Sequence, residues 1–209
     1  MQQDSVSLAA LIGSRICHDL ISPIGAISNG LELAGMTASA PMSPEMSLIQ
    51  QSCDHATARI RFFRIAFGTA TDVRPIPVAD ARKTLADHYA GTRISAEWHV
   101  VRDLGRDATQ LAYLCALCLE ATLPQGGLLR VDLREGTLVV TACASVLRDD
   151  PLLWCLLTDE GGAAVQNISP ATVQFALLGR ICRDRDVTPR RALSENETTL
   201  RLPLPLPPS

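Results

Sequence analysis

Apolar residues recur at helical spacing in two long stretches near the start of the chain, residues 5–36 and 43–68. In the second stretch they follow a heptad pattern typical of paired helices, with spacings of 4, 3, 4, 3 and 4 residues. These positions are Ile49, Cys53, Ala56, Ile60, Phe63 and Phe67. The first stretch carries a matching stripe at Ile12, Ile16, Leu20, Ile24, Ile27, Leu31 and Ala34.

A single hairpin of these two helices would leave part of both apolar stripes uncovered. Burying one large apolar side chain contributes about 1.5–3 kcal/mol, so the uncovered positions favour pairing with a second copy. The pattern therefore predicts a homodimer in which two hairpins form a four-helix bundle.

Residues 70–77 interrupt the helical pattern with two prolines and indicate a linker. The elements predicted after it are helices at 78–89, 107–123, 150–157 and 170–184, and strands at 94–101, 128–134, 137–144, 188–193 and 197–203. This order is typical of an α/β sandwich, with helices on one face of a mixed or antiparallel sheet. We therefore expect a helical hairpin domain at 1–69 and an α/β sandwich domain at 78–209.

Composition narrows the partners and the compartment. A net charge of -3 gives no bulk attraction to nucleic acid or to an anionic membrane, and no apolar run approaches a membrane span. Seven cysteines without disulfide-like spacing predict reduced thiols in the cytoplasm. Cys115 and Cys118 form a CxxC, but their helical pattern and the lack of a second pair favour core packing over zinc. The other histidines, His55, His88 and His99, lack ligand-like neighbours, so no metal site is expected.

His18 is the candidate reactive residue. At about 100° per residue it falls on the side of its helix opposite the apolar stripe. The small and polar residues that share its face are Ser14, Arg15, Ser22, Gly25 and Asn29. A glycine inside a helix costs about 1 kcal/mol relative to alanine, which close approach of another protein would explain at Gly25. An exposed imidazole without bulky neighbours can react with a macromolecular partner.

Two neighbours of His18 would influence its chemistry. Asp19 can hold a proton on one ring nitrogen and leave the other free as a nucleophile. Pro23 removes the amide that would bond the Asp19 carbonyl, which favours a kink beside the histidine. The spacing alone also fits an ordinary surface histidine next to an exposed ion pair of Arg15 and Asp19.

The motif His18-Asp19-x-x-x-Pro23 resembles the H-box of sensor histidine kinases, and the run from Ser14 to Leu33 is similar to the ChpT histidine phosphotransferases of alphaproteobacteria. The resemblance implies a dimeric hairpin followed by a degenerate histidine-kinase ATPase-like (Bergerat-type) α/β sandwich. It further implies that His18 is the phosphoacceptor and Asp19 the adjacent acid. Ser22 stands where such kinases carry a residue that helps water remove phosphate from a partner.

The same resemblance implies the partners. In the family, the receiver domain of a hybrid histidine kinase donates the phosphoryl group, and response regulators of the CtrA and CpdR type accept it. The receivers carry the Mg²⁺, so this chain needs no cofactor of its own. We expect a receiver to dock on the His18 face, over Arg15, Ser22, Gly25 and Asn29. Arg59, with Arg61 and Arg64, could meet acidic receiver surface or simply be solvated.

The nucleotide-binding signatures of a kinase are missing. Glu120 lies near the position of the Mg²⁺-binding asparagine, and the strand from Val139 to Ser145 is followed by no Asp-x-Gly-x-Gly box. Gly161-Gly162 is the only glycine pair downstream, which is weak evidence for phosphate binding. We therefore expect a phosphocarrier that does not bind ATP. The alternatives are a divergent active kinase, and a dimeric scaffold or inhibitor that carries no phosphate.

Overall fold

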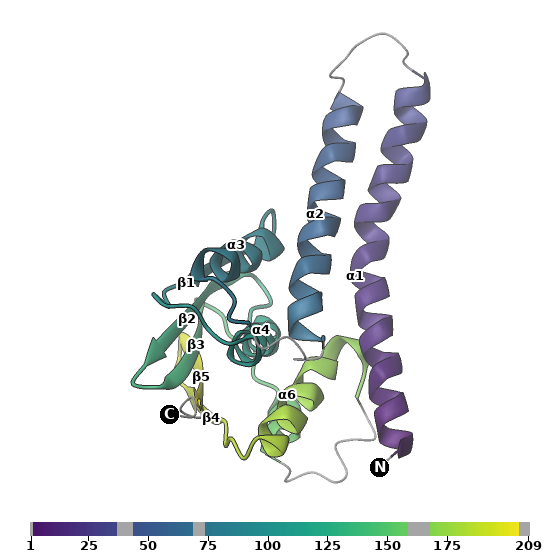
Figure 1. Ribbon diagram of the computed structural model, residues 1–209. Helices are drawn as coiled ribbons and strands as arrows, with labels where there is room; N and C mark the ends of the chain where they lie inside the picture. Colours follow the sequence, from purple (N-terminus) through teal and green to yellow (C-terminus); the bar gives the residue numbers. More distant parts are fainter. Residues whose placement is uncertain (1, 37–43, 69–73, 159–167, 205–209) are drawn as a thin grey trace.

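The computed structural model describes residues 2–36, 44–68, 74–158 and 168–204. Two long antiparallel helices, α1 (Gln2–Met36) and α2 (Pro44–Ala66), form a hairpin that projects from the remainder of the chain (Figure 1). Proline suits the first position of α2, because that residue has no intrahelical partner for an amide proton. The predicted N-cap Ser43 and the loop at 37–43 lie outside the described residues.

The second part of the chain contains the elements predicted from its pattern, in the predicted order. They are α3 (Val78–Tyr89), β1 (Ile94–Trp98), α4 (Arg106–Glu120), β2 (Gly127–Arg134), β3 (Thr137–Cys143), α5 (Pro151–Thr158), η2 (Pro170–Thr172), α6 (Val173–Asp184), β4 (Arg190–Leu193) and β5 (Glu197–Pro203). The helix predicted from residue 170 begins instead as the 3₁₀ turn η2, where the backbone amide of Ser169 donates to Thr172 Oγ1.

The five strands form one mixed sheet in the order β1-β2-β3-β5-β4. Strands β1 and β2 are parallel and the other pairs are antiparallel. Helix α4 connects the parallel pair, as a parallel connection requires a crossover. It packs against β2, β3 and β5 on one side and against α2 and α6 on the other, so its residues from Thr109 to Leu119 are all buried. The prediction of a helical hairpin followed by a mixed α/β sandwich is confirmed.

The buried environment of α4 accounts for the CxxC. Cys115 and Cys118 are both free and fully buried, and burial raises the pKa of each thiol well above its usual value. A thiol in this state packs as a small apolar side chain. The interpretation of these cysteines as core residues is confirmed.

The base of the hairpin shares its hydrophobic core with the α/β part. Phe62 of α2 is fully buried. Its ring stacks on the ring of His88, with 3.8 Å between the centroids, and on the ring of Tyr113, with 4.5 Å between the centroids. Phe63 and Ala66 belong to the same core. The predicted seam is therefore not a single buried line, because Phe62 lies outside it and Ile60 within it is 52% exposed. The α/β part covers the lower end of α2 from a second side, which a heptad count does not anticipate.

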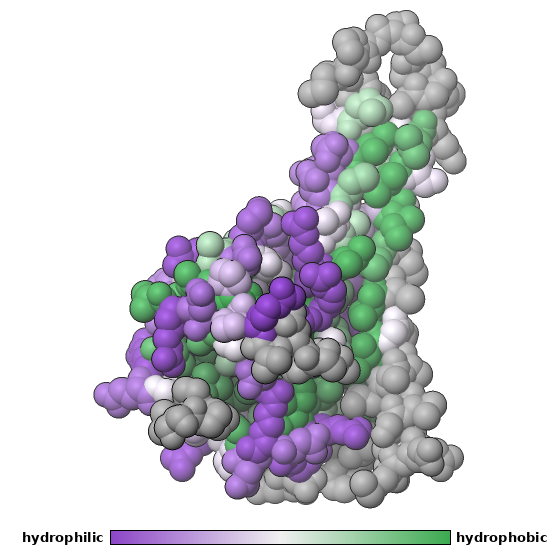
Figure 2. All heavy atoms as spheres, in the orientation of Figure 1, coloured by the Kyte–Doolittle hydropathy of each residue, from purple (hydrophilic) through white to green (hydrophobic). Residues whose placement is uncertain are grey.

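Apolar side chains remain uncovered along the hairpin. Figure 2 shows them as a stripe running along the projecting helices. Ile24 and Leu31 of α1 are each 57% exposed and, with Ile60, make up what we call the hairpin apolar face. Part of both predicted stripes is thus uncovered in one copy of the chain. Among the described residues, no helix is long and apolar enough to cross a membrane.

The buried imidazole of His88 should make the protein measurably less stable in mild acid. Its pKa is lowered from 6.5 to about 3, first by burial and then by the nearby Arg59 charge. Because the unfolded chain takes up a proton near pH 6.5 and the folded chain does not, stability falls as the pH drops below 6.5. We expect the free energy of unfolding to decrease by about 2 kcal/mol between pH 7 and pH 5 from this group. Urea unfolding at several pH values measures this dependence.

The variant His88→Phe provides the control, because it keeps a ring stacked on Phe62 and cannot titrate. Burial raises the pKa of Glu120, so this carboxyl contributes in the opposite direction in both proteins. The difference between the wild type and the variant therefore isolates His88. Parallel stability curves for the two proteins from pH 7 to pH 5 would contradict the prediction.

Candidate functional site

His18 lies on the exposed side of α1. Its side chain is 84% exposed, and ring atom Nδ1 lies 3.1 Å from Asp19 Oδ1. With a proton on Nδ1, the ring donates to this carboxylate, and Nε2 keeps a lone pair. The geometry therefore presents a ring nitrogen that can act as a nucleophile toward a group arriving from solvent.

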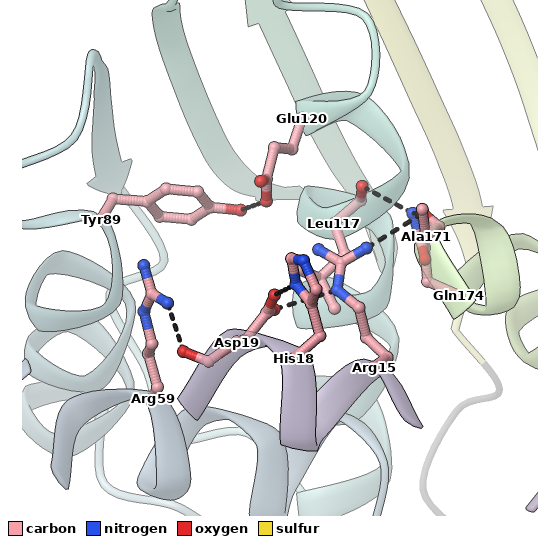
Figure 3. Close-up of polar contacts among 9 residues, drawn as sticks. All are labelled: Arg15, His18, Asp19, Arg59, Tyr89, Leu117, Glu120, Ala171 and Gln174. Atoms are coloured by element: carbon pink, nitrogen blue, oxygen red, sulfur yellow. Dashed lines mark hydrogen bonds and ion pairs between the residues drawn. The ribbon is translucent and has the colours of Figure 1, made fainter. Parts of the chain in front are cut away.

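Asp19 is held on both carboxylate oxygens. Oδ1 faces His18, while Oδ2 accepts a hydrogen bond of 2.9 Å from Arg15 Nε. A second donor of the same guanidinium, Nη1, lies 3.0 Å from the carbonyl oxygen of Ala171. Figure 3 shows Arg15 reaching from α1 to this carbonyl, beside α6.

The expectation that Arg15 lies on the open face with His18 is therefore wrong. Its side chain is only 16% exposed and faces the α/β part of the chain. A helical wheel places Arg15 close to His18, but it does not include the neighbouring η2 and α6, which contact this side of α1. The ion pair of Arg15 and Asp19, which the spacing left open as an exposed pair, is present but largely buried.

Arg59 also points inward. It is half-buried, and its Nη1 donates a hydrogen bond to the backbone carbonyl oxygen of Asp19. Pro23 is buried inside α1, and the helix continues through it to Met36. The carbonyl that Pro23 deprives of its helical donor is thus bonded from the neighbouring helix. The expectation of Arg59 as a freely exposed charge is corrected in the same way as that of Arg15.

The other predicted residues of this face are open to solvent. Ser22, Gly25 and Asn29 are exposed, and a Cβ atom added at Gly25 would meet no atom within 4 Å. The side chain of Ser14 lies outside the described residues. The three described positions leave a surface without bulky side chains on the same side of α1 as His18.

Two further residues, Tyr89 and Glu120, lie next to this site; from the sequence, Glu120 was considered only as a residue near the position of the Mg²⁺-binding asparagine. Glu120, at the end of α4, accepts a hydrogen bond of 3.1 Å from the Tyr89 hydroxyl. Burial raises the pKa of Glu120, and the charge of Arg15 is the strongest influence in the opposite direction. Its carboxylate lies on the side of Asp19 and Arg15 that faces the α/β part of the chain (Figure 3). The available signal was an acidic residue directly after the apolar run from Leu111 to Leu119 of α4.

No group of three or more His, Cys, Asp or Glu side chains within the described ranges is arranged to hold a metal ion. His99 pairs with Glu97 at 3.0 Å, and His88 packs in the core. The pair Gly161-Gly162 lies outside the described residues.

Comparisons of the sequence with known proteins identify related phosphotransferases. The family described as "Histidine phosphotransferase C-terminal domain" matches residues 78–190. Protein phosphotransferase ChpT of Brucella abortus (strain 2308) is 34% identical over 177 residues, which span 81% of this chain and 82% of the relative.

Solved structures include a bacterial phosphotransferase determined at 1.7 Å. It superposes with a TM-score of 0.76 at 28% identity, covering 94% of this chain and 96% of that chain. The histidine kinase AdeS of Acinetobacter baumannii aligns with a TM-score of 0.42 at 8% identity, covering 88% of this chain and 95% of that chain. On the family match and the identity to ChpT, the chain belongs to the ChpT-type histidine phosphotransferases.

Proposed function

We propose that His18 carries a phosphoryl group between the receiver domain of a hybrid histidine kinase and the receiver domains of response regulators. The observation that carries the proposal is the exposed His18 ring with Nδ1 held at 3.1 Å from Asp19 Oδ1. Family membership supports phosphotransfer as the activity. Regulators of the CtrA and CpdR type are the proposed acceptors.

In the proposed transfer, the Nε2 lone pair attacks the phosphorus of the receiver's aspartyl phosphate. The bond from phosphorus to the aspartate oxygen breaks, and the receiver regains a free carboxylate. The ring then holds the phosphoryl group on Nε2 and a proton on Nδ1, so it is positively charged beside Asp19. The carboxylate stabilises this charge, and the reverse steps deliver the group to another receiver. Mg²⁺ bound by the receiver would neutralise charge on the transferred oxygens.

Receiver docking is proposed over Ser22, Gly25 and Asn29, which share the exposed side of α1 with His18. A receiver must bring its aspartate to bonding distance of the imidazole, and these small or short side chains allow close approach. Ser22, one turn after His18, is also the proposed position for guiding a water molecule toward phosphate.

Replacing Gly25 with leucine should slow transfer while the protein stays folded. Leucine favours the helix by about 1 kcal/mol over glycine, and the added side chain meets open space in this chain. It would occupy the surface that the receiver needs. We expect the receiver concentration for half-maximal transfer to rise at least about tenfold, or 1.4 kcal/mol of binding free energy. Transfer rates at a series of receiver concentrations measure it.

Gly25→Ala is the matched control, because it also removes the glycine but adds only a methyl group. We expect this variant to transfer at nearly the wild-type rate. Equal rates for Gly25→Leu and the wild type would mean that the receiver approaches His18 from another side.

The proposed function is tested by incubating the wild-type protein with a phosphorylated receiver domain. The expected result is acid-labile phosphate on this chain, located at His18 by peptide mapping. A parallel incubation with Mg-ATP alone should leave the chain unlabelled, since no Asp-x-Gly-x-Gly box follows β3. Labelling from ATP would favour the divergent kinase, and no labelling from either source would favour the scaffold.

We also propose that the protein is a homodimer joined through the hairpin apolar face. Ile24, Leu31 and Ile60 are large apolar side chains that stay more than half exposed in one copy. Twofold pairing of two hairpins would cover these side chains on both copies. Such a four-helix bundle would leave the His18 side of α1 open to receivers.

A further inference from the structure

Two arginines that the pattern placed among the docking residues turn inward around Asp19. We infer that Arg15 and Arg59 are positioning residues that hold Asp19 against His18, and that Arg59 replaces the backbone amide removed by Pro23. This inference rests on the proposed function of His18 as phosphoacceptor. It assigns the arginines to the rate of the transfer step and not to the affinity for a receiver.

The first step concerns the backbone of Asp19. In a helix, the carbonyl of residue 19 would accept a bond from the amide of residue 23, and proline has no such amide. A carbonyl left without a donor away from water is costly. Arg59 Nη1 supplies the missing donor, and Figure 3 shows its side chain reaching the Asp19 backbone from α2. The neighbouring helix is thereby fixed at the residue next to His18.

The second step concerns the Asp19 side chain. Arg15 Nε binds Oδ2 at 2.9 Å, which leaves Oδ1 directed at His18 Nδ1, 3.1 Å away. Arg15 is itself fixed by the Ala171 carbonyl oxygen at 3.0 Å, an atom that also accepts from Gln174 Nε2 at 3.0 Å. The orientation of the carboxylate therefore depends on the contact between α1 and η2, just before α6.

The third step concerns charge. Two guanidinium groups that are largely withdrawn from solvent need two counter-charges, because unpaired buried cations are strongly unfavourable. Asp19 is one, and Glu120, at the end of α4, is the nearby carboxyl group that can provide the second. Burial raises the pKa of Glu120, and the charges of Arg15 and Arg59 both oppose this rise; the Tyr89 hydroxyl donates to the carboxyl group at 3.1 Å. The α/β part thus stabilises the arginines in the orientation that serves Asp19.

The functional consequence follows from the geometry of transfer. Asp19 keeps the proton on Nδ1 and so keeps Nε2 as the nucleophile. A shift of about 1 Å in a group that orients a reacting atom can reduce a rate by about a hundredfold. Loss of Arg59 frees both the Asp19 carbonyl and the contact between α1 and α2, so the maximal transfer rate should fall while receiver binding persists.

The test measures the maximal transfer rate and the half-saturating receiver concentration for Arg59→Gln. We expect the maximal rate to fall about tenfold or more, with half-saturation changed by less than about twofold. Arg59→Lys, which retains one charged donor, should recover part of the rate. Arg61→Gln, on an exposed side chain two residues along α2, shows what loss of a surface charge does, and its effect should appear in half-saturation.

A double-mutant cycle with Pro23→Ala tests the carbonyl directly. Alanine restores the amide of residue 23, so Arg59→Gln in that background should reduce the maximal rate by less than about threefold. An equal loss in both backgrounds, or a change in half-saturation alone, would overturn the inference. If Arg59→Gln does not fold, the same double-mutant cycle is measured with Arg59→Lys, and the same outcomes support or overturn the inference. An unlabelled wild type would instead remove the proposed function, so the two failures are distinct.

Discussion

Replacement of His18 with glutamine is expected to abolish phosphotransfer and leave the fold unchanged. The amide of glutamine is not nucleophilic and cannot carry a phosphoryl group. The side chain is 84% exposed, and substitutions at such positions usually change stability by no more than about 0.5 kcal/mol. Asp19 would keep its bond to Arg15, so the surrounding contacts should persist. We expect no acid-labile phosphate on the variant after incubation with a phosphorylated receiver, a loss of at least about a thousandfold in rate.

His99→Gln is the matched control for this experiment. His99 is also well exposed, but it lies just after β1 in a cluster with Glu97 and Asp132. We expect this variant to become labelled like the wild type. Circular dichroism and thermal unfolding of both variants would verify that the fold is retained. Undiminished labelling of His18→Gln would show that another residue carries the phosphoryl group.

Local sequence pattern was sufficient to predict the order of the elements. Helix α3 spans the predicted residues 78–89, and β5 spans the predicted 197–203. Such elements are bounded by prolines, glycines and changes of period, which act within a few residues along the chain. The start of α6 was missed because the turn at Pro170 still has helical composition, and its hydrogen bond between Ser169 and Thr172 is visible only in the folded chain.

Packing across elements was harder to predict than the elements themselves. Phe62 is fully buried between His88 and Tyr113, although the heptad count assigned the buried seam to Ile60 and Phe63. A heptad describes the contact of one helix with one partner. Helix α2 has α1 on one side and α3 and α4 on another, so a second buried direction was added by the tertiary structure.

Packing by neighbouring elements also explains why some predicted site residues are exposed and others point inward. Ser22, Gly25 and Asn29 are exposed as the helical wheel indicates, because no described element covers that side of α1. Arg15 and Arg59 share the polar character expected of surface residues, yet both are drawn to acceptors on other elements. Pro23 was the one signal for Arg59, since it leaves the Asp19 carbonyl in need of a donor. The donor itself, Arg59, lies 40 positions further along the chain, so local sequence cannot identify it.

The hairpin apolar face leads to the second large prediction. At least half of the side chain is exposed in one copy at Ile24, Leu31 and Ile60. In a twofold dimer each of these residues contributes to the interface from both copies. Burying half of one such side chain contributes about 1 kcal/mol, so these positions together offer several kcal/mol of association free energy. We therefore expect the wild type to sediment as a dimer at micromolar concentration.

Aspartate in place of Leu31 or Ile60 should separate the two copies. The substitution removes apolar contact and places a charge where the interface would exclude water, which is costly for an unpaired carboxylate. Each dimer would contain two such changes. We therefore expect the dissociation constant of the dimer to rise by at least about a hundredfold, or about 3 kcal/mol, giving monomer or aggregate. Gln51→Asp is the control, since it adds the same charge on the opposite face of α2 at an exposed position. Sedimentation velocity distinguishes the cases, because the control should remain dimeric while Leu31→Asp and Ile60→Asp do not. A wild-type monomer at micromolar concentration, or dimers in all three variants, would show that the hairpin apolar face is not the interface.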